Sequence, residues 1–163
     1  MYKINDKVVH SREGLSTIVN KTTMGENEYF IIHADRGGGE NIYVLVNNTT
    51  NLIRPIMNEE EAKEVIEYMK NVTAEFISNT KQRRDQYKKR LLSGNVRDLA
   101  YLSRQLYFYN YYNENGQLVK LGPTDVQMLK DAETILFDEL SISFNIDRGN
   151  VENYVKTLIG WYK

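Results

Sequence analysis

Few side chains in this sequence are suited to chemistry, and their spacing does not bring them together. His10 and His33 are the two histidines, 23 positions apart, and the chain has no cysteine. A protein zinc site needs three or four histidine, cysteine or carboxylate ligands, commonly at short spacing along the chain. Neither histidine belongs to such a pattern, so we expect no metal ion.

Two other motifs invite a chemical interpretation. Gly37-Gly38-Gly39 has the composition of a phosphate-binding loop, but no Gly-Lys-Ser/Thr follows it and no helix is expected to begin there. The tip of a β-hairpin explains these glycines better. The acidic run Glu59-Glu60-Glu61 is explained by a helix start, where the helix dipole favours negative charge. The sequence shows no nucleophile, base and orienting group in a recognisable arrangement. We therefore expect that the protein is not an enzyme and that it binds no cofactor and no small-molecule substrate.

The densest charge lies in residues 81–90, where six basic residues and one acidic residue give a local charge of +5, although the whole chain carries −1. Such a segment suits contact with a polyanion, and the alternative is an ordinary solvated helix face. A helix turns about 100° per residue, so the six cations cannot share one face. The predicted binding face is Lys81, Arg84 and Lys88, with Arg83 at its edge.

An aromatic run, Tyr107–Tyr112, follows the helix after the basic segment. Its rings could stack on nucleic-acid bases, or they could belong to a core, since Tyr107 and Tyr111 have helical spacing. The sequence leaves both interpretations open.

Composition limits the class of protein. A chain of 163 residues with 41% hydrophobic residues can form one medium domain or two small ones. The absence of cysteine excludes disulfides and fits a reducing compartment. No apolar run follows the N-terminus, and none approaches the roughly 20 residues of a membrane helix. We therefore expect a cytoplasmic protein that does not enter a membrane.

Residues 1–55 have the pattern of five short strands separated by polar turns. The predicted strands are Lys7–His10, Gly14–Val19, Tyr29–His33, Asn41–Val46 and Asn51–Arg54. The segment Asp35–Glu40 closes a hairpin between the third and the fourth. Strands of this length suggest a small curled antiparallel barrel of the SH3 or Tudor type.

Residues 56–163 have helical patterns instead. Asn58 caps a first helix with an apolar stripe, and the basic helix ends at a joint, Ser93-Gly94-Asn95, before a third helix. Thr124 with Gln127 predicts a capping box for a fourth helix, and Asn150 opens a last one. The fold class is therefore α+β, an N-terminal barrel over residues 1–55 followed by an all-α domain over residues 56–163.

In combination, these motifs resemble the CarD/CdnL family of bacterial transcription regulators. Each motif is weak alone, but their order spans nearly the whole chain. The matching segments are Asn5–Val9 with Gly14 and Ile18, Glu28-Tyr29, Ile42–Val46, Leu52–Ile56, Arg83–Leu91, Ser93–Val96, Arg97–Leu99 and Met128–Leu140.

The resemblance implies that the barrel, shared with transcription-repair coupling factor, binds the β subunit of RNA polymerase. The helical part would contact promoter DNA, mainly its phosphate backbone, and modulate the stability of the open complex. For the polymerase contact we predict Tyr43 and Leu45, which alternate onto one face of a strand with Val44 on the other, together with Lys21. The opposite alternation, with Val44 outward, remains open, and so does an adaptor whose helical part binds another protein.

The sequence departs from the family at one position that matters for DNA. Many members carry a tryptophan just before the basic helix that wedges into the minor groove, and here that position falls at or near Thr80. Threonine cannot act as an apolar wedge. Phe76 would replace it only if the connection before the helix bends toward DNA.

Overall fold

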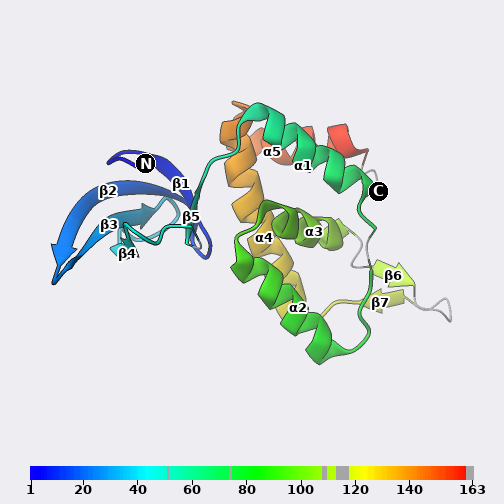
Figure 1. The fold of residues 1–163 in the computed structure, drawn as a ribbon. Coiled ribbons are helices and arrows are strands. Elements are labelled where there is room, and N and C mark those ends of the chain that lie inside the picture. Colours follow the sequence, from blue (N-terminus) through cyan, green and yellow to red (C-terminus); the bar gives the residue numbers. More distant parts are fainter. Residues whose placement is uncertain (51, 74, 108–109, 113–117, 161–163) are drawn as a thin grey trace.

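The computed structural model describes residues 1–50, 52–73, 75–107, 110–112 and 118–160, which form an N-terminal β-sheet followed by a group of helices (Figure 1). Each part has its own hydrophobic core, and among the described residues the two cores share no buried side chain. Ile53 is the last residue of the sheet core and Met57 is the first of the helical core. The predicted α+β class is confirmed.

Five antiparallel strands form the sheet in the spatial order β4-β3-β2-β1-β5. Their bounds are β1 Lys7–His10, β2 Gly14–Met24, β3 Asn27–Ala34, β4 Ile42–Leu45 and β5 Ile53–Pro55. Side chains on one face of these strands form the core, which consists of Val8, Ile18, Phe30, Ile32, Val44 and Ile53. The long strands bend around this core (Figure 1), so the sheet has the curl that was predicted from the short strands.

Strand β2 runs five residues beyond its predicted end at Val19, and β3 starts two residues before Tyr29. Met24 pairs with Asn27 across the turn at Gly25, so the two strands form one long hairpin. The added residues are mostly polar, and they are held by pairing with the neighbouring strand and not by a hydrophobic pattern. The register shifts between Ile18 and Asn20, which marks a β-bulge.

The first three helices are α1 Glu59–Asn71, α2 Thr80–Ser93 and α3 Val96–Tyr107. Asn58 caps α1 as predicted: its side chain accepts from the Glu61 backbone N–H at 2.9 Å, and the Glu61 carboxylate accepts from the Asn58 N–H at 2.9 Å. The apolar stripe predicted for α1 is buried, and it consists of Ala62, Val65, Ile66 and Met69. Gly94 ends α2 in the left-handed conformation at φ +65°, where a residue with a side chain would be strained.

The last two helices that the structure describes are α4 Pro123–Ser143 and α5 Arg148–Ile159. The capping box predicted for Thr124 and Gln127 is wrong, because the N-cap is Gly122 and Pro123 occupies the first turn. The start predicted for α5 at Asn150 is also late, because Asp147 caps that helix with its side chain. Between α3 and α4, β6 (Asn110–Tyr112) pairs with β7 (Leu118–Lys120), a pair of strands that was not predicted.

Candidate functional site

Helix α2 carries the basic segment, and its N-terminus is well defined. The Asn79 side chain accepts a hydrogen bond from the Gln82 backbone N–H at 3.0 Å and so caps the helix. The helix packs against both α3 and α4. Tyr87 points into the helical core and Leu91 is half-buried, so these two residues, four positions apart, form the apolar side of the helix.

Arg83 is buried, which corrects its predicted place at the edge of a binding face. Its guanidinium donates to the Asp125 carboxylate at 2.9 Å from Nη2 and at 3.2 Å from Nε, and Asp125 itself is fully buried. Arg83 Nη1 also donates to the carbonyl of Ile77 at 2.9 Å. The side chain therefore fastens α2 to the start of α4, and it is not available to a ligand.

Sequence reasoning missed this role because Asp125 lies 42 positions after Arg83. The only local signal was the spacing of Tyr87, which is four residues from Arg83 and buried as well. Residues four apart share a helix face. Burial also raises the pKa of the Tyr87 hydroxyl to about 12.

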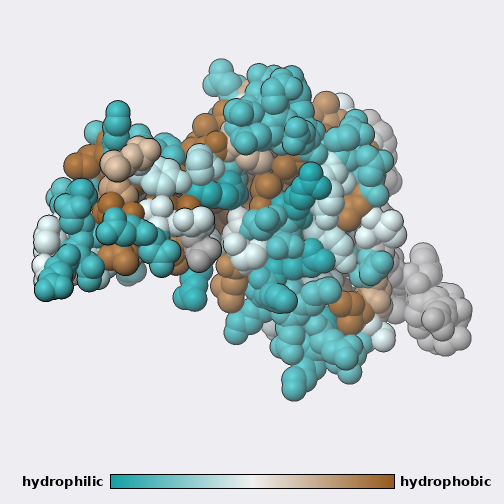
Figure 2. Space-filling model, in the orientation of Figure 1, coloured by the Kyte–Doolittle hydropathy of each residue, from teal (hydrophilic) through white to brown (hydrophobic). Residues whose placement is uncertain are grey.

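The other three residues of the predicted basic face, Lys81, Arg84 and Lys88, are exposed. Arg84 Nε lies 3.5 Å from Asp125 Oδ1, so this arginine also supports the buried pair. Lys81 and Lys88 form no ion pair with the residues that the structure describes. Figure 2 shows a largely hydrophilic surface over α2. Asp85 lies between the two lysines on the same face and lowers its net charge.

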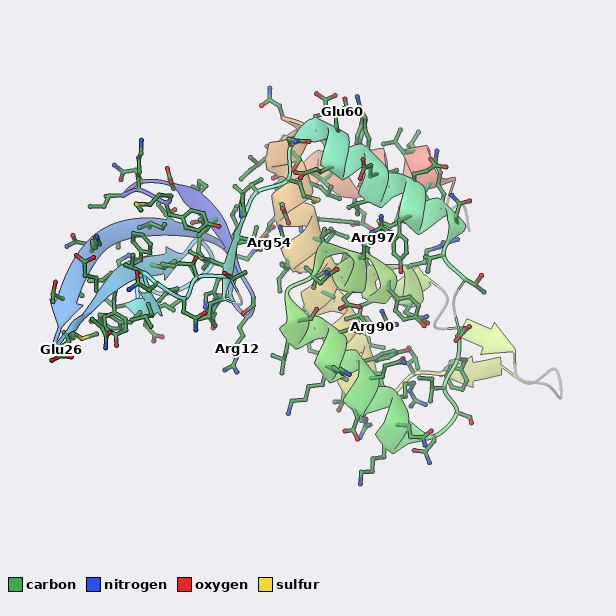
Figure 3. The ribbon with its side chains drawn as sticks, in the orientation of Figure 1. Arg12, Glu26, Arg54, Glu60, Arg90 and Arg97 are labelled. Atoms are coloured by element: carbon green, nitrogen blue, oxygen red, sulfur yellow. The ribbon has the colours of Figure 1, made fainter. Side chains whose placement is uncertain are left out.

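Arg90 belongs to the helix packing and not to the free surface. Its guanidinium lies 4.0 Å from the centre of the Tyr101 ring and donates to Asp98 at 2.7 Å. Figure 3 shows Arg90 directed from α2 toward α3. The two contacts hold the two helices together across the Gly94 joint.

The structure offers no apolar wedge before α2 among the residues it describes. Thr80 is the first residue of the helix and is exposed. Phe76 is half-buried against the helical core, and the Arg83 guanidinium lies 5.2 Å from the centre of its ring. Phe76 therefore does not project as a replacement wedge. The side chains of the aromatic run Tyr107–Tyr112 lie outside the described residues.

The second candidate surface is the free edge of the sheet at β4. Among the strands that the structure describes, β4 pairs only with β3, so its other side is a free edge of the sheet. Tyr43 is 47% exposed, Leu45 is half-buried and Val44 is fully buried, so the side chains alternate as predicted. Tyr43 lies opposite Ile31 and Leu45 lies opposite Tyr29 in the ladder. Residues opposite each other project to the same face, so four apolar or aromatic side chains gather there.

Lys21 does not join this group, although we predicted it beside Tyr43 and Leu45. It pairs with Phe30, which in turn pairs with Val44, and both of these side chains point into the core face. The bulge between Ile18 and Asn20 causes this reversal, because one extra residue exchanges the two faces for everything beyond it. The Lys21 ammonium forms an ion pair with Glu28 at 3.1 Å.

The histidines have structural partners. Nδ1 of the buried His10 accepts from the backbone N–H groups of Arg12 and Glu13 at 3.3 and 3.2 Å, which orders the turn between β1 and β2. Burial lowers the pKa of His10 and favours the neutral ring that this acceptor requires. His33 Nε2 lies 2.8 Å from Asn41 Oδ1. In the described part of the chain, no three histidine or carboxylate side chains gather in a way that would hold a metal ion.

The glycine run 37–39 lies in the connection between β3 and β4, as predicted for a hairpin tip. Within the described residues, none of the helices has the length and apolar character needed to cross a bilayer.

The architecture defines a two-part α+β protein with a free sheet edge on one part and an exposed basic helix on the other. Comparison with family models agrees with this description. The CarD-like/TRCF RID domain matches residues 2–57, and the CarD C-terminal domain matches residues 64–156. The chain therefore belongs to the CarD/CdnL family, whose members are transcription factors that interact with RNA polymerase. No curated protein matches the chain.

Proposed function

We propose that this protein binds the β subunit of RNA polymerase through its sheet and promoter DNA through α2, and that it thereby modulates the stability of the open complex. In this proposal residues 1–55 form the polymerase-contacting domain and residues 56–163 form the DNA-contacting domain. The observation that carries it is the location of two chemically different free surfaces on the two parts of one family member. No catalytic step is needed, since both surfaces suit binding alone.

The polymerase-binding surface is proposed at β4, centred on Tyr43 and Leu45. Tyrosine is enriched among residues that dominate interface energetics, because it buries a large ring and keeps a polar tip. The unpaired edge of β4 adds a second means of attachment, since a strand of the partner can pair with it. Lys21 is left out of this surface because it lies on the opposite face.

The DNA-binding surface is proposed at Lys81, Arg84 and Lys88. Contacts of lysine and arginine with phosphates position a protein on a duplex but do not read its sequence. Three such contacts predict a slope of about −3 for log K against log salt, at roughly −0.9 per contact. Without a wedge at Thr80, this binding is expected to be weaker and to stabilise the open complex less than in relatives that have the tryptophan.

The polymerase contact is tested with Tyr43→Ala, for which we expect a loss of affinity for the isolated β subunit of about tenfold or more, as for a central interface tyrosine. The matched control is Lys21→Ala, which removes an exposed side chain of the same sheet on its other face and should leave the affinity unchanged. Titration by biolayer interferometry measures both. Equal affinities for the Tyr43 variant and the unaltered protein would refute the β4 surface, whereas a loss at Lys21 alone would move the site to the opposite face.

The DNA contact is tested with Lys81→Gln combined with Lys88→Gln. These lysines are preferable to Arg84, whose replacement would also disturb Asp125. Removing two phosphate contacts should reduce the salt slope from about −3 to about −1. The control is Lys63→Gln combined with Lys70→Gln, which changes the net charge equally on α1, away from α2 (Figure 1).

Binding is measured by fluorescence anisotropy on a promoter duplex at several salt concentrations, with and without polymerase. The slope should fall only for the α2 variant. If both double variants bind DNA alike, the basic face is a solvated surface. The alternative of an adaptor whose helical part binds another protein is then favoured.

A further inference from the structure

Two consecutive acidic residues of α4, Asp138 and Glu139, are directed toward the N-terminal sheet. Glu139 is fully buried, and the side chain of Asp138 is 10% exposed. The C-terminal half of α4, which carries them, lies beside the sheet (Figure 1). Burying a carboxylate costs folding free energy unless the group is paired and hydrogen-bonded. The hydrogen-bond donors to Asp138 and Glu139 therefore identify the contacts that stabilise them.

Glu139 accepts hydrogen bonds from the strand and the connection that lead out of the sheet. Arg54 of β5 donates to its two oxygens at 2.6 and 2.7 Å, and the backbone N–H of Met57 donates to Oε1 at 2.8 Å. Arg54 also donates from Nε to the carbonyl of Gly94 at 3.1 Å. Figure 3 shows Arg54 at the junction between the sheet and the helices. One arginine therefore joins β5, α4 and the joint between α2 and α3.

Asp138 forms a second, separate attachment. Arg36, in the connection between β3 and β4, donates from Nε at 2.5 Å and from Nη2 at 2.7 Å, and Arg148 at the start of α5 donates at 2.6 Å. Burial alone would raise the pKa of Asp138, but the hydrogen bonds from Arg36 and Arg148 outweigh it and lower the pKa below its ordinary value. The carboxylate thus stays ionised near neutral pH and both arginine contacts persist.

These contacts are directional, whereas the two hydrophobic cores are separate. Domains joined by polar contacts are usually free to move relative to each other. A bidentate arginine–carboxylate pair, however, fixes distance and plane together, and two pairs at different places on the sheet oppose rotation about either one. Because no core is shared, the pairs restrain the orientation together with the close contacts of Ser11 with Gly94 and of Gly14 with Ile135.

We propose that Asp138 and Glu139 are positioning residues that hold the N-terminal sheet and the helical part in one orientation. The consequence for transcription rests on the proposed function: a protein attached to polymerase at β4 would then present α2 to DNA at a set place. Neither acidic residue touches polymerase or DNA in this account.

The orientation is tested by distance measurements between spin labels, which the absence of cysteine makes simple. One label goes on Glu26→Cys, at the end of the sheet far from the helices (Figure 3), and one on Lys89→Cys, an exposed position of α2. Double electron–electron resonance should give one narrow distribution of distances between these two labels. A second pair, Glu26→Cys with Arg12→Cys, spans only the sheet and serves as the internal control.

The variants are chosen to weaken the attachments while keeping most of their contacts, and far-ultraviolet circular dichroism checks that they remain folded. Arg36→Ala leaves Asp138 paired with Arg148, and Glu139→Gln keeps the shape and the acceptor oxygen of the side chain. The double variant combines Arg36→Ala with Glu139→Gln. We expect the distribution of distances between Glu26→Cys and Lys89→Cys to broaden in Arg36→Ala and to broaden further in the double variant. The distribution between Glu26→Cys and Arg12→Cys, within the sheet, should not change. Arg36→Lys should restore part of the narrow distribution, because it returns the charge. Unchanged sheet-to-helix distributions in Arg36→Ala and in the double variant would overturn the proposal.

A binding measurement separates this inference from the proposed function. The double variant should keep its affinity for polymerase and its weak affinity for free DNA. It should lose roughly tenfold in affinity for promoter DNA once bound to polymerase, because a mobile tether lowers the effective concentration of α2 at the DNA. Broader distances without this loss would support the positioning role and contradict the proposed DNA contact. Unchanged distances would contradict the positioning role whatever the DNA result.

Discussion

Replacing Asp125 by alanine should lower the free energy of unfolding by about 3–5 kcal/mol, the usual cost of leaving one partner of a buried ion pair alone. Arg83 would remain in the core with its charge uncompensated, since its side chain is only 7% exposed. Asp125 also lies in the first turn of α4, where a negative charge is favourable. Urea unfolding followed by far-ultraviolet circular dichroism measures the loss.

Two further variants make this prediction specific. Asp131→Ala removes an exposed carboxylate from the same helix, and its effect should stay within about 0.5 kcal/mol. Arg83→Met combined with Asp125→Ala should be less destabilised than Asp125→Ala, because the uncompensated charge is gone. If Asp125→Ala and Asp131→Ala unfold at the same urea concentration, the pair does not hold α2 in place.

Gly94→Ala should be the most damaging glycine substitution among the left-handed positions that the structure describes. A Cβ atom at Gly94 would lie 2.7 Å from Ser11 Cα and 2.9 Å from Ser11 Cβ, in the turn between β1 and β2. The left-handed conformation costs a residue with a side chain about 1–2 kcal/mol. Forcing extra volume into a packed contact typically adds about 1–3 kcal/mol.

Gly25→Ala separates these two costs. Gly25 has nearly the same φ, +62° against +65°, but a Cβ atom there would meet nothing within 4 Å. It should show only the conformational cost, and the difference between the two variants reports the contact between the sheet and the helical joint. Urea unfolding measures both. An equal loss at the two positions would show that the turn at Ser11 moves away freely.

Local patterns were enough for most elements of the fold. The alternation around Val44 and the stripe of α1 depend on periods of two and 3.6 residues, which are properties of a single segment. The joint at Gly94 and the cap at Asn58 are likewise encoded within a few residues. Errors occurred where two local signals competed, as at Pro123, which took the helix start from Thr124 because its missing N–H costs nothing there.

The short strands β6 and β7 could not be predicted for a different reason. Each has three residues, and each depends on the other for its hydrogen bonds. A strand this short has no period of its own to detect. The same holds for the polar end of β2, which is a strand because β3 lies beside it.

Patterns within single segments predict a strand-rich part followed by a helical part, the end of the basic helix at Gly94 and the resemblance to a family. Tertiary contacts determine which basic residues remain available to a ligand. Arg83 is buried in an ion pair with Asp125, and Arg90 packs on Tyr101 and pairs with Asp98. Lys21 lies on the other face of the sheet because of a β-bulge. The reason is physical: a helix or strand pattern fixes the direction of a side chain relative to its own element, whereas burial and ion pairing depend on partners that are distant in sequence.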